Sequence, residues 1–166
     1  MKAINARDLN DRANHSDDQD RIDTEKIQNP ESNHAEGAFT TNQRLASLRI
    51  LLCEDCPNTQ IIMLHILEIS GAKADVASDG GTALQMALDN FYHCILMDMR
   101  MPVMSGYEVT QQLRTAGCST PILALTGSVM MGDREKCLKA GCNDYVSRPF
   151  ALHSLLDSII GLAKKV

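Results

Sequence analysis

Five short segments suited to strands alternate with five segments of helical periodicity in the part of the chain that begins at Leu48. Several of the strand segments are continuous apolar runs, which are typical of strands buried on both faces. A strand-helix alternation repeated in this way predicts one parallel sheet covered by helices on both sides. We therefore expect an α/β domain with a doubly wound five-stranded sheet and five helices.

The expected strands occupy residues 49–53, 73–77, 94–97, 121–125 and 144–147. Helices are expected over about 58–70, after 79, from 105 until shortly before 117, over about 133–140, and over 152–163. Ser105 and Glu108 have the spacing of a capping box at the third helix start. The second strand segment is polar, with Lys73 and Asp75, so it should lie at a sheet edge.

Residues 1–47 form a polar segment of mixed charge, with nine acids and six bases before residue 45. Segments of this composition bury too little apolar surface to offset the entropy lost on folding. We therefore expect a disordered N-terminal arm, most simply a passive tail, with contact to a partner as the alternative. The folded domain is expected over residues 48–166.

Composition excludes several classes of function. The net charge is −5 and the only aromatic residues are three Tyr and three Phe, which disfavours nucleic-acid binding through phosphate contacts or base stacking. No apolar run is long enough to span a bilayer, and the N-terminus lacks a signal-peptide core, so a cytoplasmic protein without membrane contact is expected. The six cysteines should then be reduced, and Cys53 and Cys56 lack the second pair that zinc would require.

Polar side chains follow four of the predicted strands. Glu54 and Asp55 follow the first strand, Asp98 the third, Thr126 the fourth and Arg148 the fifth. Parallel strands end at the same edge of a sheet, where α/β proteins place their ligands. These five residues should therefore lie close together.

Three neighbouring carboxylates repel one another, and a cation relieves that repulsion. Oxygen ligands alone favour Mg²⁺, which commonly shares its coordination shell with a phosphoryl group. Asp98 could then act as a nucleophile toward phosphorus, with Arg148 offsetting charge and Thr126 donating to a phosphoryl oxygen. The residues immediately beside Asp98 are methionines, which offer no counter-charge, so its carboxylate should either face solvent or hold the metal.

Each of these residues also has a simpler structural interpretation. Asp98 could be a turn residue, the Glu54-Asp55 pair a solvated loop, and Arg148 a surface cation. Thr126 could cap a turn and Tyr145 could be ordinary core packing. The convergence of all of them at one sheet edge favours the site.

Residues 48–166 resemble the receiver domain of two-component response regulators. The resemblance rests on motifs that occur in order: Glu54-Asp55, Met97-Asp98-Met99-Arg100-Met101-Pro102 with Gly106, Leu125-Thr126, Asp144-Tyr145 and Arg148-Pro149-Phe150. Residues 132–138 and Ala140-Gly141 are similar to receivers attached to hybrid sensor histidine kinases, which suggests a phosphorelay.

The resemblance implies a flavodoxin-like sheet of order 2-1-3-4-5, for which a chemotaxis receiver is a known example. It implies that Asp98 is the phosphoacceptor. Mg²⁺ would be bound directly by Asp55 and Asp98, through water by Glu54, and by the backbone carbonyl of Arg100. The donor would be a phosphohistidine of a histidine kinase or of a histidine phosphotransfer domain.

By the same resemblance, Thr126 and Tyr145 would form a switch pair. Phosphorylation would reshape the face made by the fourth helix, the fifth strand and the fifth helix, which would pass the signal to a downstream protein partner. The protein would be a switch rather than a turnover enzyme. No output domain is expected after the fifth helix.

The chain departs from the family pattern at Arg148, where receivers almost always have Lys. A planar guanidinium prefers two-point contacts, so altered kinetics or partly uncoupled signalling is expected. Cys56 stands where such receivers often have Asn. The family also predicts a cis peptide bond between Arg148 and Pro149, which is uncommon for X-Pro bonds in general.

Two functions other than that of a phosphorylated receiver are also compatible with the sequence. A degenerate receiver would bind partners without phosphorylation, and Arg148 is its only support. An aspartate-nucleophile phosphatase would need a second acid two residues after the nucleophile, and that position is Arg100. A stable acyl phosphate that is absent from Asp98→Ala would exclude the first rival, and turnover of a generic phosphate ester would revive the second.

Overall fold

The computed structural model describes residues 43–127 and 132–164. The polar arm expected over residues 1–47 lies outside the described residues up to residue 42. The five strands are β1 (Arg49–Cys53), β2 (Lys73–Ala77), β3 (Cys94–Asp98), β4 (Ile122–Thr126) and β5 (Asp144–Ser147). All neighbouring strands are parallel, and their order is β2-β1-β3-β4-β5, which confirms the flavodoxin-like sheet predicted from the sequence.

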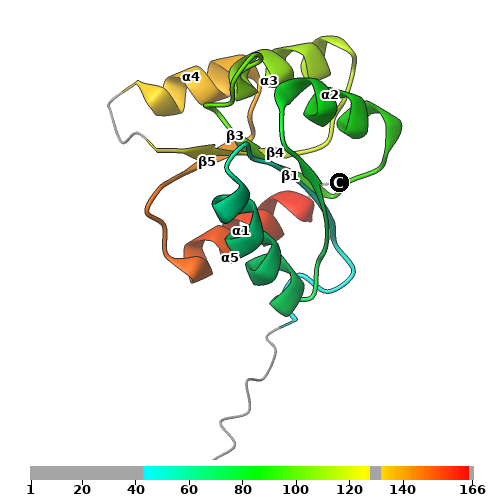
Figure 1. Ribbon diagram of the computed structural model, residues 1–166, viewed down its shortest axis with the longest axis vertical. Coiled ribbons are helices and arrows are strands. Elements are labelled where there is room, and N and C mark those ends of the chain that lie inside the picture. Colours follow the sequence, from blue (N-terminus) through cyan, green and yellow to red (C-terminus); the bar gives the residue numbers. More distant parts are fainter. Residues whose placement is uncertain (1–42, 128–131, 165–166) are drawn as a thin grey trace, which may run out of the picture. The chain divides into compact units, whose positions relative to one another are not determined.

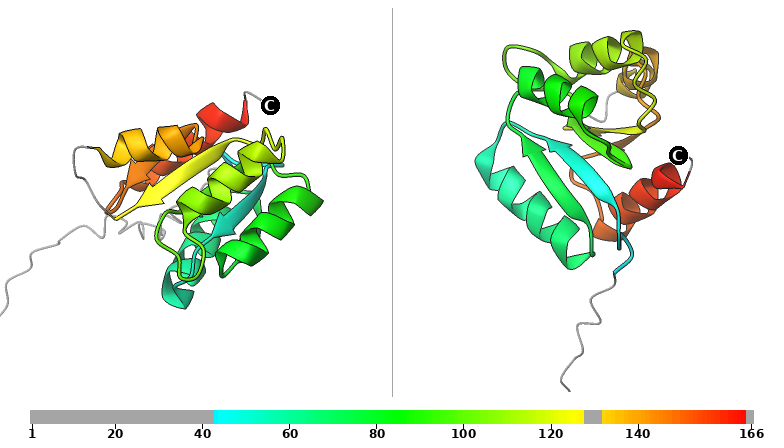
Figure 2. Two further views of the ribbon diagram at one scale, coloured as in Figure 1. Left: turned by 90° about the horizontal axis from the view of Figure 1, so that it is seen from above. Right: turned by 90° about the vertical axis from the view of Figure 1, so that its right-hand side faces the viewer.

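Five helices connect and cover the strands: α1 (Pro57–Ile69), α2 (Gly80–Asp89), α3 (Gly106–Thr115), α4 (Asp133–Ala140) and α5 (Leu152–Ala163). Helices α2, α3 and α4 lie on one face of the sheet, and α1 and α5 lie on the other (Figure 1). Both layers can be followed in the two further views (Figure 2). The fold is therefore a three-layer sandwich with the sheet in the middle.

The sheet separates two apolar cores. One core contains Leu51, Ile95 and Met97, and the other contains Ile50, Leu52 and Leu96, because successive side chains of a strand point to opposite faces. Every residue of β3 and β4 is buried, whereas β2 and β5 are partly exposed, as edge strands of such a sheet should be. The apolar runs seen in the sequence are the central strands.

The central strands hold two site residues in their last positions. β3 extends to Asp98 and β4 to Thr126, one residue further than the sequence pattern predicts. Asp98 pairs with Leu125 across the ladder, and the Met99 N–H donates to the Leu125 carbonyl at 3.1 Å. The backbone that carries the site is thus fixed by sheet hydrogen bonds.

Helices α2 and α3 begin with side-chain caps. The Ser105 side chain accepts the Glu108 N–H while the Glu108 carboxylate accepts the Ser105 N–H, which confirms the capping box. These hydrogen bonds hold the pKa of Glu108 below its ordinary value. Asp79 caps α2 by accepting the Thr82 N–H at 2.8 Å. Not every apolar residue of the helices is buried, since Leu88 and Leu152 remain 49% and 46% exposed.

Residues just before β1 belong to the packed structure. Leu45 is fully buried among the residues of the α1–α5 core, and its N–H donates to the Ser70 carbonyl at 2.8 Å. Arg44 forms an ion pair with Asp157 of α5. The packed chain therefore includes residues ahead of position 48.

All six cysteines are free, as expected for reduced thiols, and Cys53 of β1 is buried in one of the two cores. Burial raises the pKa of the Cys142 thiol to about 11 and that of Cys94 to about 12, which keeps both protonated near neutral pH. Within residues 43–127 and 132–164, no helix is long and apolar enough to cross a membrane.

Candidate functional site

The strand ends bring the predicted polar residues to one edge of the sheet. Glu54 directly follows β1, Asp98 ends β3 and Thr126 ends β4. Arg148 directly follows β5, and its N–H donates to the Thr126 carbonyl at 2.7 Å. Residues separated by up to 94 positions therefore meet, as the strand-exit argument requires.

Three carboxylates form a cluster at this edge. One ligand oxygen of each of Glu54, Asp55 and Asp98 lies within 4.8 Å of the others. Glu54 and Asp98 are only 1% and 6% exposed, whereas Asp55 is exposed. Burial raises the pKa of Glu54 above its ordinary value, although the Arg148 guanidinium opposes that effect. Hard oxygen donors with one open side fit a Mg²⁺ ion that keeps part of its water shell.

Arg148 binds two of these carboxylates at once. Its Nη1 donates to Asp98 Oδ2 at 3.0 Å and its Nη2 to Glu54 Oε2 at 2.5 Å. Asp98 is buried, so the first alternative, a carboxylate that faces solvent, is wrong, and Arg148 supplies a counter-charge besides any metal that Asp98 holds. The counter-charge comes from 50 residues further along the chain, which local sequence could not indicate. The surface-cation reading of Arg148 is excluded by the same contacts.

Backbone groups orient the two buried carboxylates from the other side. Asp98 Oδ1 accepts the Arg100 N–H at 2.8 Å, and Glu54 Oε1 accepts the Cys56 N–H at 3.2 Å. Each carboxylate thus has one oxygen on the guanidinium and the other on a loop N–H. These hydrogen bonds restrict the orientation of both carboxylates.

The predicted switch residues lie on neighbouring strands. Thr126 is 4% exposed at the end of β4. Tyr145 of β5 is half-buried, and it pairs in register with Ala124, two positions before Thr126. The Arg134 guanidinium of α4 lies 6.0 Å from the centroid of the Tyr145 ring. Tyr145 therefore links β5 to α4 at the side of the site.

Two glycines permit close approaches that the strand-exit pattern does not predict. A Cβ on Gly106 would lie 2.2 Å from the Asp98 carbonyl oxygen, so α3 can begin against the end of β3 only with glycine there. A Cβ on Gly127 would lie 2.2 Å from Arg100 Nη2. The Arg100 side chain therefore covers the backbone next to Thr126. A glycine directly after Thr126 was the available signal for this contact.

The Arg148-Pro149 peptide bond is cis, as predicted. Val103, in the loop between β3 and α3, has a φ of 67° and is fully exposed. A β-branched residue rarely adopts this left-handed conformation. The loop beside Asp98 therefore contains one unfavourable backbone conformation at a solvent-exposed position.

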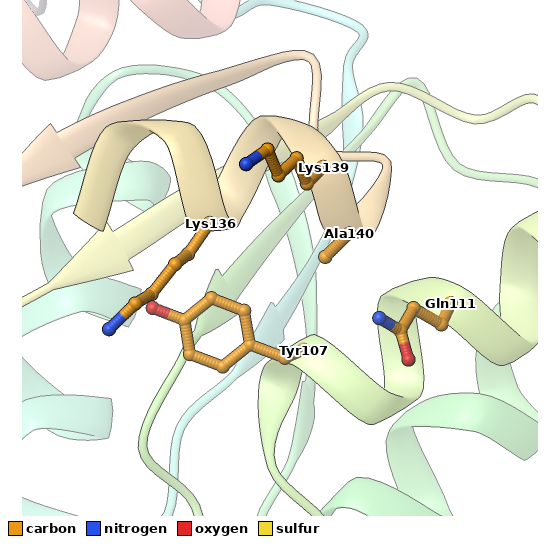
Figure 3. Close-up of a pocket in the computed structure, with 5 residues that line it drawn as sticks. All are labelled: Tyr107, Gln111, Lys136, Lys139 and Ala140. Carbon is orange, nitrogen blue, oxygen red and sulfur yellow. The ribbon is translucent and has the colours of Figure 1, made fainter. Parts of the chain in front are cut away.

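Two surface hollows flank this region without containing the carboxylates. One, of about 320 Å³, lies between α3 and α4 and is lined by Tyr107, Gln111, Lys136, Lys139 and Ala140 (Figure 3). The other, of about 330 Å³, includes Tyr145, Phe150 and Ser154 at the β5–α5 side. The predicted switch residue Tyr145 thus contributes to a surface groove.

Known proteins share both the sequence pattern and the fold. The family model of the response regulator receiver domain matches residues 50–160. The transcriptional regulatory protein HprR of Escherichia coli is 38% identical over 112 residues, which cover 68% of this chain and 50% of that protein. RprY of Bacteroides fragilis is 32% identical over 72% of this chain and 50% of its own length. The chain therefore spans about half the length of the curated relatives that it matches.

Solved structures give the same result. The receiver domain of the sensor histidine kinase PA1611 from Pseudomonas aeruginosa, crystallised with a magnesium ion in its active-site cleft, is 38% identical, with a TM-score of 0.67 over 72% of this chain and 99% of that one. The receiver domain of Ssk1 from Saccharomyces cerevisiae, solved with the histidine phosphotransfer protein Ypd1, is 30% identical, with a TM-score of 0.66 over 70% of this chain and 89% of that one. The chain belongs to the response regulator receiver family and is a receiver domain of two-component signalling.

Proposed function

We propose that this receiver accepts a phosphoryl group on Asp98 from a phosphohistidine and acts as a switch in a phosphorelay. The observation that supports this most strongly is the position of Asp98, buried at the end of β3 between two other carboxylates and a guanidinium. A carboxylate placed there is oriented by the Arg100 N–H and has a cation close by for the incoming negative charge.

In the proposed transfer, a carboxylate oxygen of Asp98 forms a bond to phosphorus while the bond from phosphorus to the imidazole nitrogen breaks. The other ring nitrogen of the phosphohistidine carries a proton, and the electron pair of the broken bond remains on the histidine, so the products are an acyl phosphate and a neutral imidazole. Thr126 donates its hydroxyl to a phosphoryl oxygen and Arg148 offsets the added charge. Rearrangement of Thr126 and Tyr145 then changes the α4–β5–α5 face.

Mg²⁺ is part of the proposal. Asp55, Asp98 and the backbone carbonyl of Arg100 would bind it directly, and Glu54 through water. When bound, the metal neutralises charge on the phosphoryl oxygens. The magnesium ion in the PA1611 receiver supports this assignment.

The proposed partners are a histidine kinase or a histidine phosphotransfer domain and a downstream protein, in the cytoplasm. The complex of the Ssk1 receiver with the phosphotransfer protein Ypd1 supports the second type of donor. The resemblance of residues 132–141 to hybrid-kinase receivers supports the same type of pathway.

The test is phosphorylation with a small phosphodonor and Mg²⁺, followed by mass spectrometry. We expect one phosphoryl group on the parent and on Asp89→Ala, an exposed aspartate outside the site, and none on Asp98→Ala. No acyl phosphate on the parent would favour a phosphorylation-independent binding module. Rapid turnover of a generic phosphate ester would instead indicate a phosphatase.

A further inference from the structure

Within residues 43–127 and 132–164, the site has more negative charge than Arg148, the one cation that forms ion pairs with it, can neutralise. Three carboxylates lie within 4.8 Å of one another, and Arg148 contacts two of them. The third, Asp55, is exposed and forms no ion pair with any other described residue. A second cation would therefore compete with the guanidinium for the same oxygens, or replace it.

A second cation would compete with Arg148 for the same two carboxylates. Arg148 spans Glu54 and Asp98, whose side chains are 2% and 9% exposed, with a separate nitrogen on each. The remaining guanidinium nitrogen, Nε, is buried and has no hydrogen-bond partner. The guanidinium thus depends on these two carboxylates for its hydrogen bonds at the site, and they depend on it for counter-charge.

We propose that Arg148 is a positioning residue that competes with Mg²⁺: it closes the carboxylate cluster when metal is absent and leaves Glu54 when metal binds. The metal takes over part of the neutralisation of Glu54 and Asp98. The released guanidinium then becomes available to a phosphoryl oxygen. This last consequence rests on the phosphoryl transfer of the proposed function, whereas the competition rests only on its Mg²⁺ site.

The identity of the cation decides how strong the competition is. A guanidinium has a rigid fork of donors that can hold two carboxylates simultaneously, whereas an ammonium is a compact point charge. A lysine at position 148 would be expected to hold Glu54 and Asp98 less firmly together. Mg²⁺ would then meet a less effective competitor.

The first experiment is titration of the metal-free protein with Mg²⁺ in a calorimeter. We expect Arg148→Lys to bind Mg²⁺ about fivefold more tightly than the parent, which corresponds to about 1 kcal/mol. Arg49→Lys is the matched control, since Arg49 also pairs with a carboxylate but at the start of β1. Equal affinities of the parent and Arg148→Lys would overturn the proposal, as would the absence of binding by both at millimolar Mg²⁺.

A second experiment tests whether Glu54 is the shared partner. In the Glu54→Gln background, Arg148→Lys should change the Mg²⁺ affinity by much less than fivefold, because one arm of the bridge is already weakened. The same factor in both backgrounds would overturn the role of Glu54. Thermal unfolding with and without Mg²⁺ gives a separate readout: the midpoint of Arg148→Lys should fall relative to the parent only without metal.

These measurements do not use phosphorylation. A receiver whose metal affinity responds as expected but that takes no phosphoryl group on Asp98 would contradict the proposed function alone. A receiver that is phosphorylated on Asp98 but whose metal affinity ignores position 148 would contradict the competition alone.

Discussion

The sheet carries an arginine-carboxylate cluster near each end of its strands, and the two differ in burial and in balance. Near the strand starts, Arg49 Nη2 lies 2.9 Å from Asp75 Oδ2, and both side chains are 43% exposed. Tyr92 also donates to this carboxylate at 3.0 Å, and the Arg49 guanidinium lies 5.3 Å from the Tyr92 ring. At the strand ends, Arg148 is 28% exposed and faces two carboxylates that are almost fully buried.

The difference separates a supporting cluster from a reactive one. Asp75 has one cation, one neutral donor and water, so its charge is satisfied whatever happens elsewhere. Among the described residues, Glu54 and Asp98 share one cation, Arg148, and both carboxylates are almost fully buried. A change in charge at either carboxylate therefore changes the free energy of unfolding strongly. The two clusters contain the same residue types but differ in burial and in the number of carboxylates that share each arginine.

The largest expected effect is that of Arg148→Ala in metal-free buffer. Removal of the guanidinium leaves two buried carboxylates without a cation, which should lower the free energy of unfolding by about 3 kcal/mol. Urea denaturation in the presence of a chelator measures this. Arg49→Ala should cost less than about 1 kcal/mol, because its pair is half-exposed. If Arg148→Ala and Arg49→Ala lowered the free energy of unfolding equally, the two clusters would not differ in their contribution to stability.

Gly106→Ala should have the next largest effect. The new methyl group would lie 2.2 Å from the Asp98 carbonyl oxygen, so α3 or the end of β3 must shift, at a cost of about 2 kcal/mol. Gly161→Ala, where nothing lies within 4 Å of the added carbon, is the control and should stabilise α5 by about 0.5 kcal/mol. The midpoints of thermal unfolding of the two variants should therefore move in opposite directions. A higher midpoint for Gly106→Ala would show that the methyl group does not clash with the Asp98 carbonyl oxygen.

Tyr92→Phe tests the supporting cluster. Burial raises the pKa of Tyr92 to about 12, so its hydroxyl remains a donor to Asp75 throughout the neutral range. Its loss should cost about 1 kcal/mol, since Arg49 and water still satisfy the carboxylate. Mg²⁺ affinity should not change. A change in metal affinity would show that the two clusters are coupled through the sheet.

The smallest expected effect is a difference in pH dependence between the parent and Glu54→Gln. The folded state raises the pKa of Glu54, so it binds the proton more readily than the unfolded chain does. The contribution of Glu54 to stability is then largest below its ordinary pKa and decreases as the pH rises through the raised value. The stability of the parent relative to Glu54→Gln should therefore increase as the pH falls from 7 toward 4.5. A difference that does not depend on pH would contradict this.

Much of the fold could be predicted from local patterns. The central strands are continuous apolar runs because both faces of β3 and β4 are covered, and the capping box marks the start of α3. Local patterns did not predict how deeply each apolar helix residue is buried, and Leu88 and Leu152 remain about half exposed.

The composition of the site could also be predicted, since parallel strands must end at one edge. Residue order alone therefore placed Glu54, Asp55, Asp98, Thr126 and Arg148 together. What it could not predict was which of them touch. The contact of Arg100 with Gly127 and the burial of Leu45 depend on packing between segments that have no local signal of it.

The sequence by itself determined the sheet, the edge at which the site lies and the residue types available there, because strand periodicity and strand exits are local properties. Only the tertiary structure decided that Asp98 is buried on Arg148 rather than exposed. The reason is physical: a buried charge must find its counter-charge in space, and here that partner lies 50 residues away along the chain.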